Sequence, residues 1–176
     1  MMTFTTQVSQ NQFLAAGADR VHAVLSVSAA PAGAGGGRLA EALLVDCSAS
    51  MGGEKSRHAK DAVQTAIDLL PEDAWFCVVA GTDRAEVVFP LAQATSGNKK
   101  AAHTAVRRML ANGGTAMSTW LAEANRELAK APPGSIRHAL LLTDGKNEGE
   151  SDDRLVAVLQ TCEGRFQCDA RGVGAD

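Results

Sequence analysis

The stretch that decides the fold is Leu43-Leu44-Val45-Asp46-Cys47-Ser48-Ala49-Ser50-Met51-Gly52-Gly53. Its apolar start predicts a buried strand that ends on the carboxylate of Asp46, and the turn that follows presents the hydroxyls of Ser48 and Ser50. In α/β sheets, ligands bind outside the carboxyl ends of the strands. Carboxylate and hydroxyl oxygens suit a hard divalent cation such as Mg²⁺, which takes octahedral oxygen ligands and keeps bound water. The sequence therefore predicts an oxygen-rich cation site at the end of this strand.

Strand and helix signals alternate after residue 38. Continuous apolar runs predict strands buried on both faces at 42–45, 75–79 and 139–142, and a last strand is expected at 166–173. Apolar residues at helical spacing predict helices at 54–70, 98–110, 117–128 and 153–162. Residues 86–89 follow a hairpin turn, and we expect an antiparallel edge strand that ends at Pro90. The pattern predicts an α/β fold with a Rossmann-like, mostly parallel sheet, helices on both faces and one antiparallel edge strand.

Two extra strands precede this alternation, around residues 4–8 and 21–27. Residues 31–37 are too rich in glycine for a helix or a strand and are expected to be a flexible connector. We therefore divide the chain into an N-terminal strand pair at 1–30, the connector at 31–37 and an α/β domain at 38–176. Because a lone hairpin is marginally stable in water, we expect the strand pair to be part of an incomplete β-sandwich that pairs at a sheet edge or with a second chain.

Composition excludes several classes of partner. The chain has 176 residues and a net charge of −3, so no basic surface for nucleic acid is expected. No apolar stretch approaches the ~20 residues that cross a membrane, and the amino terminus lacks the pattern of a secretory signal. The four cysteines form no C-x-x-C pair, and we expect reduced thiols in a cytoplasmic protein.

Two further segments carry polar residues to the edge of the sheet where the first loop lies. They are the loop Gly113-Gly114-Thr115 and the strand end Thr143-Asp144-Gly145. With the first loop they give D-x-S-x-S, then G-G-T, then T-D-G. This order resembles the metal-ion-dependent adhesion site of bacterial-type von Willebrand factor type A domains, and the resemblance covers roughly residues 38–174.

The resemblance implies a metal site made by Asp46, Ser48, Ser50, Thr115 and Asp144. Both serine hydroxyls would touch the ion, Thr115 would reach it directly or through water, and the two aspartates would supply negative charge. The expected ion is Mg²⁺, with Mn²⁺ or Ca²⁺ as alternatives. A Glu or Asp of a protein partner would complete the coordination shell, so the resemblance implies a non-enzymatic, metal-dependent protein-binding module. Family members usually continue into a further helix, which we expect residues 38–176 to lack, and an uncovered sheet face would favour self-association.

Other functions stay open at this stage. Asp46 could be the acceptor of a Mg²⁺-dependent phosphoryl-transfer enzyme, although Ser48 stands where such phosphatases need a second Asp. A serine hydrolase is disfavoured because no G-x-S-x-G elbow occurs. A structural domain whose site never holds metal is the third alternative. The basic cluster Lys55, Arg57 and Lys60 is interpreted as a solvated helix face.

Overall fold

The computed structural model describes residues 2–10, 13, 17, 19–31, 37–145, 147 and 149–174. The chain divides into two units, residues 1–37 and 38–176. In the first unit, β1 (Met2–Gln10) pairs with β2 (Ala23–Pro31) as an antiparallel ribbon. Most of the expected connector, residues 32–36, lies outside the described residues.

The second unit is built on a sheet with the strand order β5-β4-β3-β6-β7. Its strands are β3 (Leu39–Asp46), β4 (Trp75–Gly81), β5 (Ala85–Gln93), β6 (Ile136–Thr143) and β7 (Gln167–Gly172). All neighbouring pairs are parallel except β4 and β5, which are antiparallel. The expected mostly parallel sheet with one antiparallel edge strand is confirmed.

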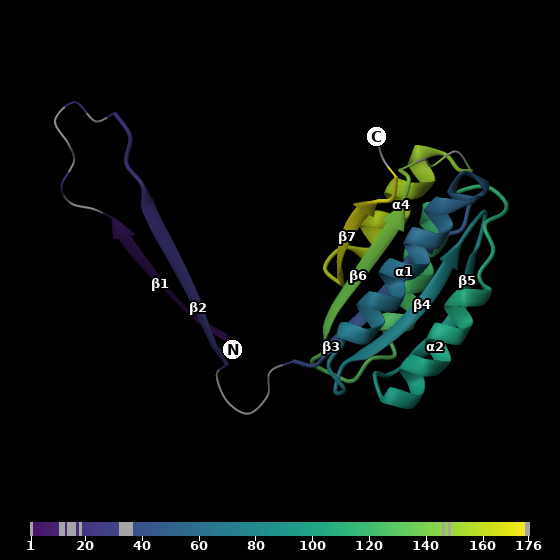
Figure 1. Ribbon diagram of the computed structural model, residues 1–176, viewed down its shortest axis with the longest axis horizontal. Helices are drawn as coiled ribbons and strands as arrows, with labels where there is room; N and C mark the ends of the chain where they lie inside the picture. The colour runs from purple at the N-terminus through teal and green to yellow at the C-terminus, as the bar shows by residue number, and fades with distance from the viewer. Residues whose placement is uncertain are drawn as a thin grey trace. The chain divides into compact units, whose positions relative to one another are not determined.

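Helices cover both faces of this sheet (Figure 1). They are the short 3₁₀ helix η1 (Ala49–Met51), α1 (Glu54–Leu69), α2 (Ser96–Arg108), α3 (Met117–Leu128) and α4 (Asp152–Cys162). The central strand β3 supplies alternate side chains to the two cores. Leu43 packs in the core under α1 and α2, whereas Leu44 packs in the core under α3. A strand buried on both faces explains the unbroken apolar run of the sequence.

Most element boundaries shift by a few residues from expectation, and two of the shifts have a clear physical cause. The edge strand does not end at Pro90 but continues to Gln93, because Pro90 lies in a β-bulge where two residues of β5 face one residue of β4. An edge bulge tolerates the missing N–H of proline. Helix α2 begins at Ser96, two residues earlier than expected, because the Thr95 hydroxyl accepts a 3.3 Å hydrogen bond from the backbone N–H of Asn98 and caps the helix.

Within those described ranges, no helix is both long and apolar enough to cross a lipid bilayer.

Candidate metal site

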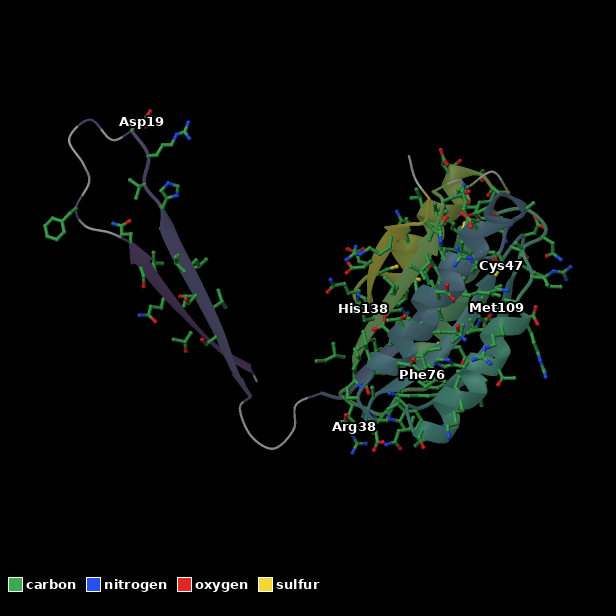
Figure 2. The ribbon with its side chains drawn as sticks, viewed as in Figure 1. Asp19, Arg38, Cys47, Phe76, Met109 and His138 are labelled. Atoms are coloured by element: carbon green, nitrogen blue, oxygen red, sulfur yellow. The ribbon has the colours of Figure 1, made fainter. Side chains whose placement is uncertain are left out.

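The three loops singled out by the sequence meet at the carboxyl end of the sheet. The N–H of Ala49 donates to the carbonyl of Gly113 at 2.9 Å, and the N–H of Asn112 donates to the carbonyl of Cys47 at 2.7 Å. The N–H of Gly149 donates to the carbonyl of Thr115 at 2.7 Å and joins the third loop to the second. In Figure 2, Cys47 marks this end of the domain and Arg38 marks the opposite end. Backbone hydrogen bonds, and not only proximity, therefore hold the loops together.

Asp46 is the buried anchor of the first loop. Its Oδ1 accepts a 2.8 Å hydrogen bond from the N–H of Ser48, and its Oδ2 accepts a 2.7 Å hydrogen bond from the hydroxyl of Thr143. Both carboxylate oxygens thus have protein donors that fix the plane of the group. Each oxygen has a second lone pair, so the carboxylate can still accept a bond from a metal-bound water.

The two serines of the first loop stand side by side, with their Oγ atoms 3.0 Å apart. Two neighbouring ligands of an octahedral Mg²⁺ ion, with bonds of about 2.0–2.1 Å, lie about 2.9 Å apart. The spacing of Ser48 and Ser50 therefore fits one edge of such a coordination shell. Ser48 is buried and Ser50 is exposed, so this pair lies where the protein interior meets solvent.

The remaining two predicted ligands lie on the neighbouring loops. Thr115 is buried, and a Cβ placed on Gly149 would lie 2.3 Å from its carbonyl oxygen, so only glycine lets the third loop approach this closely. Asp144 follows β6 directly, and its side chain is only 3% exposed. Ser48 thus contacts Asp46 through its N–H and Ser50 through its hydroxyl, whereas Thr115 and Asp144 lie on the neighbouring loops that backbone hydrogen bonds tie to this one.

Lys55 is a site residue that the sequence interpretation missed. Its Nζ lies 3.1 Å from Oδ2 of Asp144. Lys60, from the same predicted basic cluster, donates a 2.6 Å hydrogen bond to the carbonyl of Met109. The interpretation of this cluster as a solvated face is therefore wrong for two of its three members. A lysine in the first turn of a helix, where the dipole disfavours a cation, was the available signal.

Glu150 and Asn147 were also missed, and both serve the start of α3. The N–H of Ser118 donates to Oε1 of Glu150 at 2.8 Å, and the hydroxyl of Ser118 donates to Oε2. The N–H of Met117 donates to Oδ1 of Asn147 at 3.3 Å. The third loop therefore caps the helix that follows Thr115, and a carboxylate suits the positive end of the helix dipole.

The cysteine within the first loop does not belong to the donor set. Cys47 packs in the core, where burial, reinforced by the Asp46 carboxylate, raises the pKa of its thiol to about 11. A thiol that stays protonated is a poor metal ligand. Over the part of the chain that the structure describes, no group of three or more His, Cys, Asp or Glu side chains is placed to hold a metal. Hydroxyl and carboxylate oxygens suit a hard cation better than zinc, so the chemistry of the predicted ligands fits Mg²⁺, Mn²⁺ or Ca²⁺.

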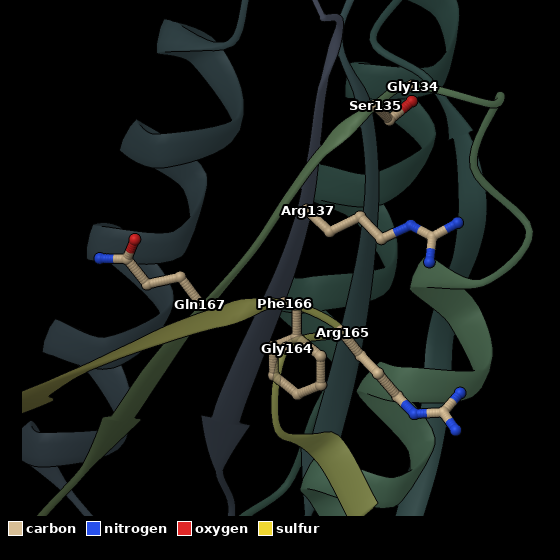
Figure 3. A pocket seen from close by; sticks show the side chains of 7 residues that line it. All are labelled: Gly134, Ser135, Arg137, Gly164, Arg165, Phe166 and Gln167. Atoms are coloured by element: carbon tan, nitrogen blue, oxygen red, sulfur yellow. The ribbon is translucent and has the colours of Figure 1, made fainter.

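A cavity of about 520 Å³ lies at the other end of the sheet, beside the amino ends of β6 and β7 (Figure 3). Arg137, Arg165 and the ring of Phe166 line it. None of the five predicted metal ligands does. The candidate site is thus formed by surface loops and not by this cavity.

Comparison with known proteins places the fold of this chain in a family. The solved structure "von Willebrand factor type A from Catenulispora acidiphila" is 43% identical with a TM-score of 0.78, and the match covers 96% of this chain and 40% of that chain. The uncharacterized protein sll0103 of Synechocystis sp. is 36% identical over 116 residues, which are 66% of this chain and 27% of that protein. Human inter-alpha-trypsin inhibitor heavy chain H4 is 28% identical over 76% of this chain, which spans 15% of that protein. Residues 42–173 match the family described as the von Willebrand factor type A domain, and the chain belongs to that family.

Proposed function

We propose that this chain is a metal-dependent protein-binding module that captures a carboxylate of its partner. Von Willebrand factor type A domains are generally protein-interaction modules. The observation that carries the proposal is the 3.0 Å spacing of the Ser48 and Ser50 hydroxyls beside the fixed carboxylate of Asp46. Ser48, Ser50 and Thr115 would hold the ion through neutral oxygens, and Asp46 and Asp144 would supply its counter-charge. A bound Mg²⁺, Mn²⁺ or Ca²⁺ would offer an electrophilic position for a partner's Glu or Asp.

The first loop supports binding over phosphoryl transfer. A phosphoryl acceptor needs a carboxylate oxygen that an incoming phosphorus atom can reach. Asp46 is buried, and both of its oxygens accept hydrogen bonds that hold them in place. A phosphatase screen with Mg²⁺ is expected to give the same background for the wild-type protein and for Asp46→Asn.

The contacts of the serines also support a non-enzymatic role. The Ser48 hydroxyl is 3.0 Å from that of Ser50, whereas a serine nucleophile needs a base such as His. Two histidines are engaged with carboxylates away from the serines, since His103 pairs with Asp68, and His138 pairs with Glu41 and Asp169.

All four cysteines are free thiols, which is compatible with the expected cytoplasmic location.

Calorimetric titration with Mg²⁺ tests the metal site. The wild-type protein is expected to bind, and the double variant Ser48→Ala/Ser50→Ala is expected to bind at least tenfold more weakly because two neutral oxygen ligands are lost. Ser96→Ala removes an exposed hydroxyl at the start of α2 and is the matched control. The proposal fails if the wild type binds none of Mg²⁺, Mn²⁺ and Ca²⁺, or if the double variant binds as the wild type does.

Paired peptides test the capture of a carboxylate. A set of immobilised peptides with a central Glu is compared with the same set carrying Gln. We expect binding of wild-type protein to a subset of Glu peptides in Mg²⁺, with release by EDTA and no binding by the double serine variant. Equal binding to Glu and Gln peptides, or retention in EDTA, would contradict carboxylate capture while leaving the metal site intact.

A further inference from the structure

The ion pair between Lys55 and Asp144 joins α1 to the end of β6 across 89 positions of sequence. The Asp144 side chain is 3% exposed and the Lys55 side chain is 36% exposed, so the carboxylate is buried and the ammonium lies at the boundary with solvent. A buried carboxylate is strongly stabilised by a nearby cation. Lys55 therefore supplies positive charge to a group that is also a predicted metal ligand.

The position of Lys55 is unfavourable for the helix itself. It is the second residue of α1, where the positive end of the helix dipole disfavours a cation. Its aliphatic stem crosses toward the end of β7, since a Cβ placed on Gly174 would lie 3.2 Å from Cγ of Lys55. The contact with Asp144 is therefore the interaction that this placement of Lys55 makes possible, at a helix position that disfavours a cation.

We propose that Lys55 is a built-in competitor of the divalent cation at Asp144. This inference rests on the proposed metal-dependent function. The Lys55 ammonium occupies Oδ2 of Asp144 when no metal is bound, and it must move away before that carboxylate can serve a divalent ion. Like charges repel strongly at short range in the partly buried edge of a protein. Lys55 would thus keep the loops folded without metal and would lower the affinity of the site for metal.

If Lys55 supported metal binding, its removal would change the metal affinity in the opposite direction. If Lys55 instead stayed on Asp144 and oriented its second oxygen toward the ion, its removal would weaken metal binding. Replacement by a neutral residue of similar length therefore distinguishes competition from orientation. It also separates both from a purely structural ion pair, whose loss would change stability without changing affinity.

The test uses Lys55→Met, Lys55→Gln and Lys55→Arg in the full chain, with Lys100→Met on the exposed face of α2 as the matched control. Calorimetric titration with Mg²⁺ and Mn²⁺ gives affinities, and thermal unfolding is measured in EDTA and in saturating Mg²⁺. We expect at least tenfold tighter binding for the two neutral variants and wild-type affinity for Lys55→Arg and Lys100→Met. We also expect a lower Tm in EDTA for Lys55→Met, and a larger rise on adding Mg²⁺ than in the wild type.

Unchanged or weaker binding by both neutral variants, with normal binding by the wild type, overturns the competition but leaves the proposed function standing. Absence of metal binding by the wild type overturns both. Lys55→Gln keeps a hydrogen-bond donor and serves as the second neutral variant should Lys55→Met unfold in EDTA. Tighter binding by Lys55→Gln alone then supports the competition, and wild-type affinity of that variant overturns it.

Discussion

The hydroxyl of Thr143 donates a 2.7 Å hydrogen bond to Oδ2 of Asp46, although 97 positions separate the two residues. The same hydroxyl accepts a 3.0 Å hydrogen bond from the N–H of Gly145. Thr143 therefore connects the ends of the two central parallel strands, and it also shapes the turn that carries Asp144. One hydroxyl thus positions parts of two loops of the candidate site.

Replacing Thr143 with Val should loosen this connection. The valine keeps the shape of the side chain but leaves a buried oxygen of Asp46 without its donor, so we expect a loss of about 1–3 kcal/mol in the free energy of unfolding. Metal affinity should fall as well, because the Asp46 carboxylate is no longer fixed. Urea denaturation and calorimetric titration measure the two effects. Thr104→Val on the exposed surface of α2 is the control, and equal losses in both variants would refute the role of Thr143.

Gly81 at the end of β4 lies against the ring of Trp120, which donates a 2.8 Å hydrogen bond from Nε1 to the carbonyl of Thr82. A Cβ placed on Gly81 would lie 2.2 Å from Cδ2 of Trp120. Gly81→Ala should therefore displace the indole and destabilise the domain by about 1–3 kcal/mol, as overpacking does. Near-ultraviolet circular dichroism and urea denaturation report the change.

Gly97 provides the control for that substitution. It lies in α2, and a Cβ placed there would meet nothing within 4 Å. Gly97→Ala is expected to be neutral or to stabilise the domain by up to about 1 kcal/mol, because alanine has the higher helix propensity. Similar stabilities for the two alanine variants would show that Trp120 can move away from Gly81 without penalty.

The fold class could be predicted because β3 is apolar on both faces and the helices repeat their apolar residues at helical spacing. The three loops could be ordered along one edge for the same reason. The ends of the strands were harder to predict from the sequence. The bulge at Pro90 depends on the N–H of Leu91, which donates to Glu127 on α3 at 3.0 Å. No local pattern reports such a contact.

The side-chain partners of the site could not be predicted for a related reason. Lys55 and Glu150 are charged residues of the kind that usually lie on a solvated surface. Each meets its partner only after distant parts of the chain fold together. The T-D-G pattern predicted the position of Asp144 but not the cation beside it. Sequence patterns identify residues that chemistry requires, whereas long, flexible side chains find partners through tertiary geometry.

Two lysines link α1 and α2 in a reciprocal way. Lys60 of α1 donates to the carbonyl of Met109 at the end of α2 at 2.6 Å, and Lys99 of α2 donates to the carbonyl of Leu70 at the end of α1 at 2.6 Å. Cations at helix C-termini satisfy free carbonyls and oppose the dipole. Lys60→Met and Lys99→Met should each lower the free energy of unfolding by about 1 kcal/mol.

Urea denaturation at low and high salt checks this pair of contacts. The loss of unfolding free energy in Lys60→Met and Lys99→Met should be smaller at high salt, because salt screens the interactions of exposed charges. Lys100→Met on the exposed face of α2 should change stability by less than about 0.5 kcal/mol. A loss for Lys100→Met as large as that for Lys99→Met would indicate a general effect of charge and not helix capping.

Glu41 makes the stability of the domain depend on pH. Burial raises the pKa of its carboxyl above the ordinary value of 4.5, against the opposing effect of His138, whose Nδ1 lies 2.8 Å from Oε1 of Glu41. The folded protein therefore holds this proton more tightly than the unfolded chain does. The corresponding stabilisation is fully present below pH 4.5 and is lost as the pH rises through the raised pKa.

Glu41→Gln removes this titration and keeps a hydrogen-bonding side chain. The stability of the wild type relative to this variant should fall as the pH is raised from 4.5 to 7. Urea denaturation at several pH values gives the difference directly. For the control Glu72→Gln, at an exposed position, the difference in stability from the wild type should not change with pH. If the stability of the wild type relative to Glu41→Gln instead rose with pH, the effect of His138 on the pKa of Glu41 would outweigh that of burial.

The ribbon of β1 and β2 has one apolar and one polar face. Val8 lies opposite Leu25 and Thr6 lies opposite Val27, so these residues share one face, whereas Ser9 lies opposite Val24 on the other. Val8 and Leu25 are 64% and 63% exposed within the described chain. Since a two-stranded ribbon is marginally stable in water, we predict that its apolar face promotes self-association of the chain.

Sedimentation over a range of concentrations tests this prediction. Val8→Thr/Leu25→Thr should weaken association at least tenfold because it replaces two apolar side chains of this face with threonine, a β-branched residue that favours a strand. Val24→Thr is the matched control, since Val24 is 66% exposed but points to the polar face. If the wild type is monomeric at every concentration, or if the control weakens association equally, the apolar face is not the contact. A selective effect would show that the ribbon buries its Val8 and Leu25 side chains against a second copy of the chain.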